Sequence, residues 1–142
     1  MSYKIIKLEK IQTKEGYMFP IYRNWDSSHN NHIPKMVYAT TINNKVEKDI
    51  ILHKHRTTFL TCIKGEVSME LLVDNEIIEI ILNGPDFESP NILLLEPDIP
   101  FKIKNNSNDE AVLINCPSPS WHPEKQDTFK FKSWEEYKNW LE

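Results

Sequence analysis

Glycine is scarce in this chain of 142 residues. It has three glycines, and they lie far apart, at Gly16, Gly65 and Gly84. The phosphate-binding loops of dinucleotide-binding and P-loop proteins need several glycines close together. The sequence therefore argues against a NAD site of that kind and against ATP hydrolysis.

The chain also lacks an excess of basic residues. It has 17 lysines and arginines against 21 aspartates and glutamates, a formal net charge of −4, and the basic residues are scattered. Nucleic-acid phosphates select for a basic surface or a concentrated basic stripe. We therefore expect no nucleic-acid partner.

Cysteines and long apolar runs are few as well. Cys62 and Cys116 lie far apart in apolar segments, so we expect two buried free thiols and neither disulfide nor nucleophile. No run approaches the length that spans a bilayer, and the segment Met1 to Ile5 lacks the apolar stretch of a signal peptide. We expect a cytoplasmic protein with no membrane partner.

Short apolar or alternating segments, separated by turn residues, dominate the rest of the chain. Two turns predict hairpins, one at residues 13–16 near the N-terminus and a tight one at Asp74-Asn75. The expected strands are 3–11, 16–23, 33–42, 49–56, 59–63, 67–73, 76–82, 92–95, 101–104 and 111–116.

Only the tail of the chain has helical periodicity. Ser133 and Glu136 have the spacing of a capping box, and Trp134, Tyr137 and Trp140 recur at helical spacing. About ten short strands followed by one helix is typical of an all-β double-sheet barrel, and a jelly roll fits best. We predict a single domain over residues 1–142.

Two histidines stand out within the segment Asp49 to Arg56. Side chains two residues apart in a strand point to the same face, so His53 and His55 are expected to face the barrel interior together. Apolar residues surround the pair, and a buried polar side chain must be hydrogen-bonded, bound to metal or catalytic. For two imidazoles on one face we favour a functional role over a structural one.

Several segments together resemble the cupin superfamily. They are His53-Lys54-His55-Arg56, the apolar strand that leads to Gly65, the Asp74-Asn75 hairpin, and the run from Leu95 to Pro100. Within that superfamily the chain is similar to the nucleotide-sugar branch, which holds the dTDP-4-keto-6-deoxyglucose 3,4-ketoisomerases and, more distantly, the dTDP-4-keto-sugar 3,5-epimerases. The resemblance implies a cupin-type double-stranded β-helix and an isomerase that needs no cofactor.

The ketoisomerases carry a Gly-Phe-His-Ala-His-Lys-type strand where this chain has Ile51 to Arg56, and an Arg-Val-Tyr-type strand where it has Met36-Val37-Tyr38. This match implies that His53, His55 and Tyr38 are catalytic. Moving a proton beside a sugar ketone requires a base of near-neutral pKa, a donor for the enolate oxygen and an acid. The two histidines can share the base and donor roles, with Tyr38 as a relay.

The chain departs from this branch at two places. An arginine that commonly precedes the histidine strand and helps to hold the diphosphate is replaced by Asp49-Ile50, which leaves the nucleotide part of the substrate open. The candidate substrate-binding residues are Arg56, Lys64, Arg23 and Lys102, for a diphosphate, and Trp121, for a base or sugar ring. The acid tyrosine of the epimerases falls within residues 113–116, where this chain has none. The second departure favours ketoisomerisation over epimerisation.

Two other classes remain open. In a metal-dependent cupin dioxygenase, a glutamate and a third histidine complete the metal site, but here those positions fall near Thr58 or Phe59 and near Phe101, so we expect no bound metal. The third candidate function is that of a jelly roll that binds a sugar without catalysing a reaction, and the missing arginine supports it. We expect a nucleotide-sugar ligand and a homodimer, the commonest closed assembly.

Overall fold

The computed structural model describes residues 2–86, 90–119, 124 and 126–142. Its elements are β1 (Tyr3–Lys7), β2 (Ile11–Gln12), β3 (Tyr17–Met18), η1 (Ser27–His29), β4 (Tyr38–Ile42), β5 (Ile50–His53), β6 (Thr58–Lys64), β7 (Glu66–Val73), β8 (Glu76–Asn83), β9 (Asn91–Leu95), β10 (Phe101–Lys104), β11 (Ala111–Asn115), β12 (Thr128–Phe131) and α1 (Trp134–Leu141).

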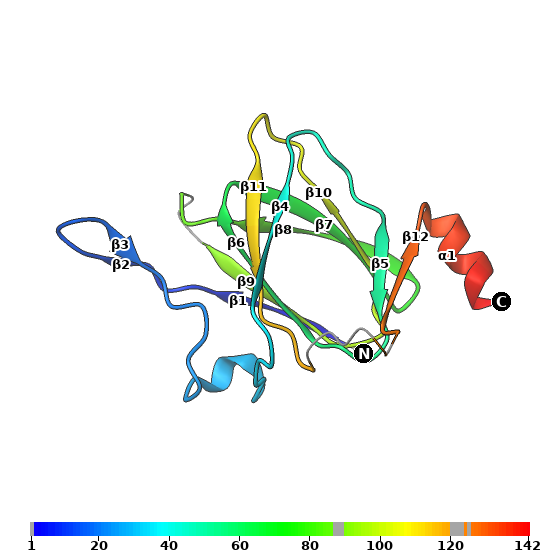
Figure 1. Ribbon diagram of the computed structural model, residues 1–142, viewed down its shortest axis with the longest axis horizontal. Coiled ribbons are helices and arrows are strands. Elements are labelled where there is room, and N and C mark those ends of the chain that lie inside the picture. The colour runs from blue at the N-terminus through cyan, green and yellow to red at the C-terminus, as the bar shows by residue number, and fades with distance from the viewer. Residues whose placement is uncertain (1, 87–89, 120–123, 125) are drawn as a thin grey trace.

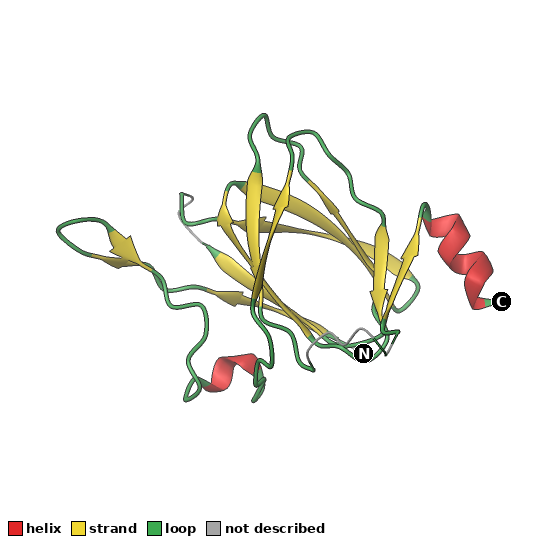
Figure 2. Cartoon of the chain, viewed as in Figure 1, coloured by secondary structure: helices red, strands yellow, loops and turns green. Residues whose placement is uncertain are grey.

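Two antiparallel five-stranded sheets form the body of the molecule (Figure 1). The first sheet has the order β1-β9-β6-β11-β4, and the second has the order β12-β5-β10-β7-β8. Each sheet combines strands that are distant in sequence, as a jelly roll requires. The predicted all-β, cupin-type fold is confirmed, and Figure 2 shows that strands dominate the chain.

The core lies between the two sheets. In β7 buried and half-buried residues alternate, and its inward side chains, Val67, Met69, Leu71 and Val73, belong to one apolar cluster. Strand β11 contributes Ala111 and Leu113 to the same cluster from the opposite sheet. Period-two patterning therefore decides which residues fill the barrel.

Tight turns set the register of the central hairpins. Asp74 and Asn75 both have positive φ angles, 51° and 64°, which a type I′ turn between β7 and β8 requires. Gly65, with a φ of 81°, connects β6 to β7. The predicted Asp74-Asn75 hairpin is thus confirmed.

The terminal helix α1 packs on the outer face of the second sheet, over β12, β5 and part of β7. The Ser133 side chain caps it by accepting a 3.1 Å hydrogen bond from the Glu136 N–H. The Glu136 carboxylate accepts from the N–H of Lys132 and completes the cap. Behind the helix, Tyr137 packs with a cluster that includes Leu52 of β5, as the aromatic spacing of the tail predicted.

The N-terminal predictions are partly wrong. Strand β1 pairs with β9 and takes no part in a hairpin with residues 16–23. Around the predicted turn there is only a hairpin of two-residue strands, β2 and β3, which stands away from the barrel (Figure 1). Residues 33–37 precede β4 and are not strand, and β12 was not predicted. The pairing of β1 with a distant strand explains the error, because local alternation does not identify the partner.

Two further predictions concern cysteines and membranes. Cys62 and Cys116 are both buried and free, as expected. Burial raises the pKa of the Cys62 thiol to about 11, which keeps it protonated at neutral pH.

Over the part of the chain that is described, no helix combines the length and apolarity needed to cross a bilayer.

Candidate active site

His53 lies inside the barrel at the end of β5. The alternation of this strand sends Ile50 and Leu52 toward α1, while Ile51 packs against the barrel core. His53 follows Ile51 by two residues and so shares its inward face. Its exposed fraction is 9%, and its ring lies 5.8 Å from that of Phe101 on β10. The prediction of a buried, inward-facing His53 is confirmed.

Strand β12 holds one nitrogen of this ring. Thr128 is the pairing partner of His53, and its Oγ1 lies 2.9 Å from the imidazole Nδ1. A carboxylate oxygen of Asp127, Oδ2, lies 3.7 Å from the same nitrogen. At 3.7 Å the carboxylate is an electrostatic neighbour and not a hydrogen-bond acceptor, and its negative charge favours the tautomer with the proton on Nδ1. The lone pair of Nε2 is then available to take a proton.

Burial and the neighbouring charges keep His53 neutral. Burial, and after it the positive charge of Arg56, lowers the pKa of His53 from 6.5 to about 4, and the negative charge of Asp127 partly opposes this shift. At neutral pH the imidazole is therefore unprotonated, as a general base must be, but its pKa lies well below the near-neutral value expected from the sequence.

Asp127 connects three groups at this end of the barrel. Besides facing His53, its Oδ2 lies 3.2 Å from the Nε of Arg56, and its Oδ1 accepts a 2.7 Å hydrogen bond from the His55 N–H. Arg56 is 5% exposed, so its charge is compensated by Asp127 inside the protein. This carboxylate places a negative charge beside the His53 ring and offsets the charge of the buried guanidinium.

His55 does not share the position of His53. Strand β5 ends at His53, residues 54 and 55 form a bend, and the His55 side chain is exposed. The expectation that both imidazoles face the interior is therefore wrong for His55. The physical reason is the contact of its backbone N–H with Asp127, which turns the chain out of the strand.

Tyr38 lies on the opposite sheet, at the start of β4. It shares the inward face of the strand with Thr40 and Ile42, and Ile42 belongs to the barrel core. Asn115 of β11 donates a 2.8 Å hydrogen bond from Nδ2 to the Tyr38 hydroxyl, and its Oδ1 accepts from the Phe59 N–H at 3.1 Å. Because the amide donates to the phenol oxygen, the phenol proton is free for another acceptor.

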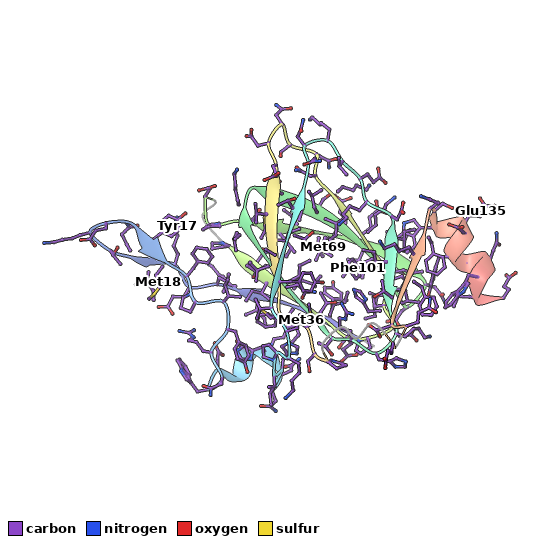
Figure 3. All side chains as sticks on the ribbon, in the orientation of Figure 1. Tyr17, Met18, Met36, Met69, Phe101 and Glu135 are labelled. Atoms are coloured by element: carbon purple, nitrogen blue, oxygen red, sulfur yellow. The ribbon has the colours of Figure 1, made fainter. Side chains whose placement is uncertain are left out.

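Tyr38 and His53 lie at the same end of the barrel. Strand β4 begins and β5 ends at the lower end of the view in Figure 1. In Figure 3 the labelled Met36, which precedes β4, lies in the lower half of the barrel. The unprotonated imidazole and the phenol donor thus lie at the same end of the barrel, one on each sheet.

The predicted basic residues do not gather at this end of the barrel. Lys64 is exposed at the far end of β6, and Lys102 pairs with Glu47 on the outer face of β10. Arg23 contacts Glu9 and Asp26 in the loop after β3. Of the four predicted cations, only Arg56 lies beside His53. Trp121, the aromatic candidate, lies outside the described residues.

The positions that complete a metal site in other cupins carry no metal ligands. Thr58 lies on the inward face of β6, and Phe101 packs beside His53. Across the described ranges, no three histidine, cysteine, aspartate or glutamate side chains are placed to hold a metal ion. That the protein binds no metal stays a prediction.

Sequence reasoning missed Asn115, Asp127 and Thr128. Asn115 ends the apolar run 111–114, and a lone polar residue at an inward strand position is a usable signal. Asp127 and Thr128 carry no such signal, because only the pairing of β12 with β5 brings them to His53.

The fold and the buried imidazole define a cupin-type jelly roll with a candidate catalytic centre at one end of the barrel. Residues 1–138 match the FdtA family, described as WxcM-like, C-terminal. The chain belongs to this family, and its predicted place in the nucleotide-sugar branch of the cupins is confirmed. No curated protein sequence matches the chain.

Solved structures with this fold include sugar isomerases. QdtA, a sugar 3,4-ketoisomerase from Thermoanaerobacterium thermosaccharolyticum in complex with TDP, has 23% identity over 98% of this chain and 97% of that chain, with a TM-score of 0.73. WlaRB, a TDP-quinovose 3,4-ketoisomerase from Campylobacter jejuni, has 20% identity, 96% coverage of both chains and a TM-score of 0.73.

A 3,5-epimerase shares the fold as well. RmlC from Legionella pneumophila, in complex with dTDP-4-keto-L-rhamnose, has 13% identity over 91% of this chain and 72% of that chain, with a TM-score of 0.75. At these identities the likeness establishes the architecture, and the chemistry must be argued from the residues of this chain.

The lowered pKa of His53 predicts acid sensitivity. The unfolded chain binds a proton at this residue near pH 6.5, whereas the folded chain binds it only near pH 4. Stability should therefore fall as the pH drops from about 6.5 to about 4, and each unit of pKa difference is worth about 1.4 kcal/mol. His53→Gln should remove this contribution, measured as the loss of unfolding free energy in urea between pH 7 and pH 4.5.

The exposed His55 supplies the control, since His55→Gln should keep the wild-type pH dependence. His32, whose pKa burial also lowers, contributes equally to all three proteins. A His53→Gln protein that loses as much stability in acid as the wild type would contradict the buried, neutral state of His53.

Proposed function

We propose that this protein is a cofactor-independent isomerase that converts a 4-keto nucleotide-linked deoxysugar into its 3-keto isomer. The observation that carries the proposal is the buried, unprotonated His53, whose Nδ1 is held by β12 and whose Nε2 has no hydrogen-bond partner among the described residues, at the same barrel end as the Tyr38 phenol. The similarity in fold to QdtA and WlaRB supports the choice of substrate class.

The proposed reaction moves one proton between carbons and one between oxygens. His53 Nε2 takes the proton from C3, and Tyr38 gives its proton to the C4 carbonyl oxygen as charge develops there, which forms an enediol. The imidazolium then returns its proton to C4 while the Tyr38 oxygen takes the proton of the C3 hydroxyl. Both residues end in their starting states, so no cofactor is consumed.

Asp127 and Asn115 have positioning roles in this scheme. Asp127 stabilises the imidazolium that forms when His53 is protonated, because its carboxylate lies on the Nδ1 side. The Asn115 amide donates to the Tyr38 oxygen and so stabilises negative charge on it during the relay. Each group is thus held in the protonation state from which its step begins.

Two alternative functions would require other features of the site. A 3,5-epimerase needs an acid on the inner face of β11, but the inward residues of that strand include Leu113 and Asn115 and no tyrosine. A non-catalytic sugar-binding jelly roll is favoured by the positions of Lys64, Arg23 and Lys102, which lie away from the end of the barrel that holds His53. Detection of substrate turnover separates this last reading from the isomerase.

Replacing His53 tests the base. In deuterated water with TDP-4-keto-6-deoxyglucose, the wild type should exchange the C3 proton, and His53→Asn should slow this exchange by about 10²–10⁴-fold. His55→Asn should lose less, because its exposed side chain is not held toward the substrate. Proton NMR of the sugar measures both rates.

Wild-type exchange in a folded His53→Asn protein would disprove the assignment of the base. Equal, large losses in both variants would show that His55 turns inward when substrate binds. Binding without exchange by the wild type would support the sugar-binding alternative.

Replacing Tyr38 and Asn115 tests the relay. Tyr38→Phe should lower kcat by about 10²-fold or more, since it removes the transferable proton. Asn115→Leu should lower kcat less, with little change in KM, because the phenol remains but loses its donor. If Asn115→Leu has the same effect in the Tyr38→Phe background as alone, the two residues do not act together.

We also propose a homodimer in which the β2–β3 hairpin contacts the second chain. Two-residue strands are not stable alone, and this hairpin stands away from the barrel with Met18 55% exposed. Light scattering should give twice the mass of one chain. Met18→Asp should shift the protein to monomer, whereas Ile81→Asp, on the exposed face of edge strand β8, should not; a monomeric wild type contradicts the proposal.

A further inference from the structure

The terminal helix α1 is too short to be stable alone, so its place on the barrel depends on its contacts. It has eight residues, and its buried side chain is Tyr137. Tyr137 packs with Ile50 and Leu52 on the outer face of β5. A second contact, which Trp134 makes at the first position of the helix, lies further across the sheet.

Trp134 connects the start of the helix to β7. Its indole Nε1 donates a 2.9 Å hydrogen bond to Oε1 of Glu70, whose other carboxylate oxygen lies 2.6 Å from the Nζ of Lys104 on β10. The side chains of Glu70 and Lys104 are only 16% and 24% exposed. A charged acceptor that is partly buried forms a stronger hydrogen bond than a neutral one in water. The helix is therefore fixed to a strand that β5 and β10 separate from β12.

The same helix lies over the outer side of β12 (Figure 1). Strand β12 has four residues and lies at the edge of the second sheet, paired to β5. Its alternation sends Phe129 and Phe131 outward. The ring of Phe131 lies edge-on to that of Tyr137 at 5.2 Å, and the ring of Phe129 lies 5.3 Å from that of Trp140. Because so short an edge strand has few backbone hydrogen bonds, these aromatic contacts hold it in place.

The inner side of β12 faces the candidate active site. Thr128 lies on that side, with its Oγ1 2.9 Å from the Nδ1 of His53. Two residues, Lys132 and Ser133, connect β12 to α1. The Lys132 N–H donates to the Glu136 carboxylate, and the Ser133 hydroxyl accepts from the Glu136 N–H. Since this connection is short and hydrogen-bonded, a displacement of the helix also displaces β12.

The C-terminal half of the helix contacts the turn that follows His53. The Nζ of Lys54 lies 6.0 Å from the ring centroid of Trp140 and 2.8 Å from Oδ1 of Asp98. The Asp98 N–H donates to the His53 carbonyl at 2.7 Å. The helix thus acts on His53 from two directions, on its backbone through this turn and on its ring through β12.

We propose that Trp134 and Glu70 are positioning residues for His53. Their hydrogen bond fixes α1 over β12, and β12 in turn holds Thr128 and Asp127 beside the imidazole Nδ1. Both residues lie on the outer face of the second sheet, whereas the imidazole lies on its inner face, so they act through β12. The expected effect on the reaction rate rests on the proposed function, but the expected effect on the His53 tautomer does not.

Trp134→Phe tests the inference, because it keeps an aromatic ring and removes the N–H. Without the hydrogen bond to Glu70, the helix and β12 can move, and the His53 Nδ1 loses its partners. At about pH 8, where imidazoles are neutral, nitrogen NMR of the His53 ring should show a change from the Nδ1-protonated tautomer to a mixture of tautomers. The signals that are missing from the His53→Gln protein identify this ring.

The rate of sugar proton exchange provides a second readout. A displacement of about 1 Å at a catalytic group can cost up to about 10²-fold in rate, so we expect Trp134→Phe to lower kcat by about tenfold and to leave KM unchanged. Glu70→Leu should have the same effects on tautomer and rate. Glu70→Gln keeps an oxygen that accepts from Trp134 and should behave as the wild type does. Trp25→Phe is the matched control, since Trp25 is 73% exposed and lies in the loop before η1.

The tautomer distinguishes a positioning role from a purely structural one. A Trp134→Phe protein that loses unfolding free energy in urea but keeps the wild-type tautomer and kcat would overturn the inference. A wild-type His53 with its proton on Nε2, or a Glu70→Gln protein as impaired as Glu70→Leu, would overturn it as well. A changed tautomer in both Trp134→Phe and Glu70→Leu, in a protein that exchanges no sugar proton, would support the positioning role while the isomerase proposal fails.

Discussion

The pairing of β12 with β5 is the interaction on which the candidate active site depends. It places Thr128 opposite His53 and brings Asp127 to the same ring nitrogen. Without it the imidazole would have no fixed tautomer, and Arg56 would be a buried charge without a counterion. A strand of four residues near the C-terminus thus determines the chemical state of a histidine far away in sequence.

The two sheets contribute different residues to the candidate active site. The second sheet carries His53 and is backed by α1, whose Tyr137 packs behind Leu52. The first sheet carries Tyr38 and Asn115 on its inner face and is backed by the loop that holds His29 and His32 against Phe59. Because α1 and this loop each cover part of an outer face, the strand residues beneath them are buried on both sides of the sheet, and a polar residue there acquires a defined environment.

Local patterns predicted much of this fold. The strands from β6 to β11 lie close to the apolar or alternating segments that predicted them, and the Asp74-Asn75 turn and the Ser133 cap form as their residue types require. Prediction failed where the partner of a segment is distant. Strand β1 pairs with β9, and His55 leaves the strand because its N–H meets Asp127, which follows it by 72 residues.

The sequence by itself determined the all-β class, the core-facing residues, the terminal helix and the inward position of His53. Each of these follows from residue periodicity or from turn and cap chemistry within a few positions. Only the tertiary structure decided that His53 is neutral, that Asn115 holds Tyr38, and that the cations expected around a diphosphate lie apart. Those properties depend on burial and on long-range strand pairing, which a local pattern does not encode.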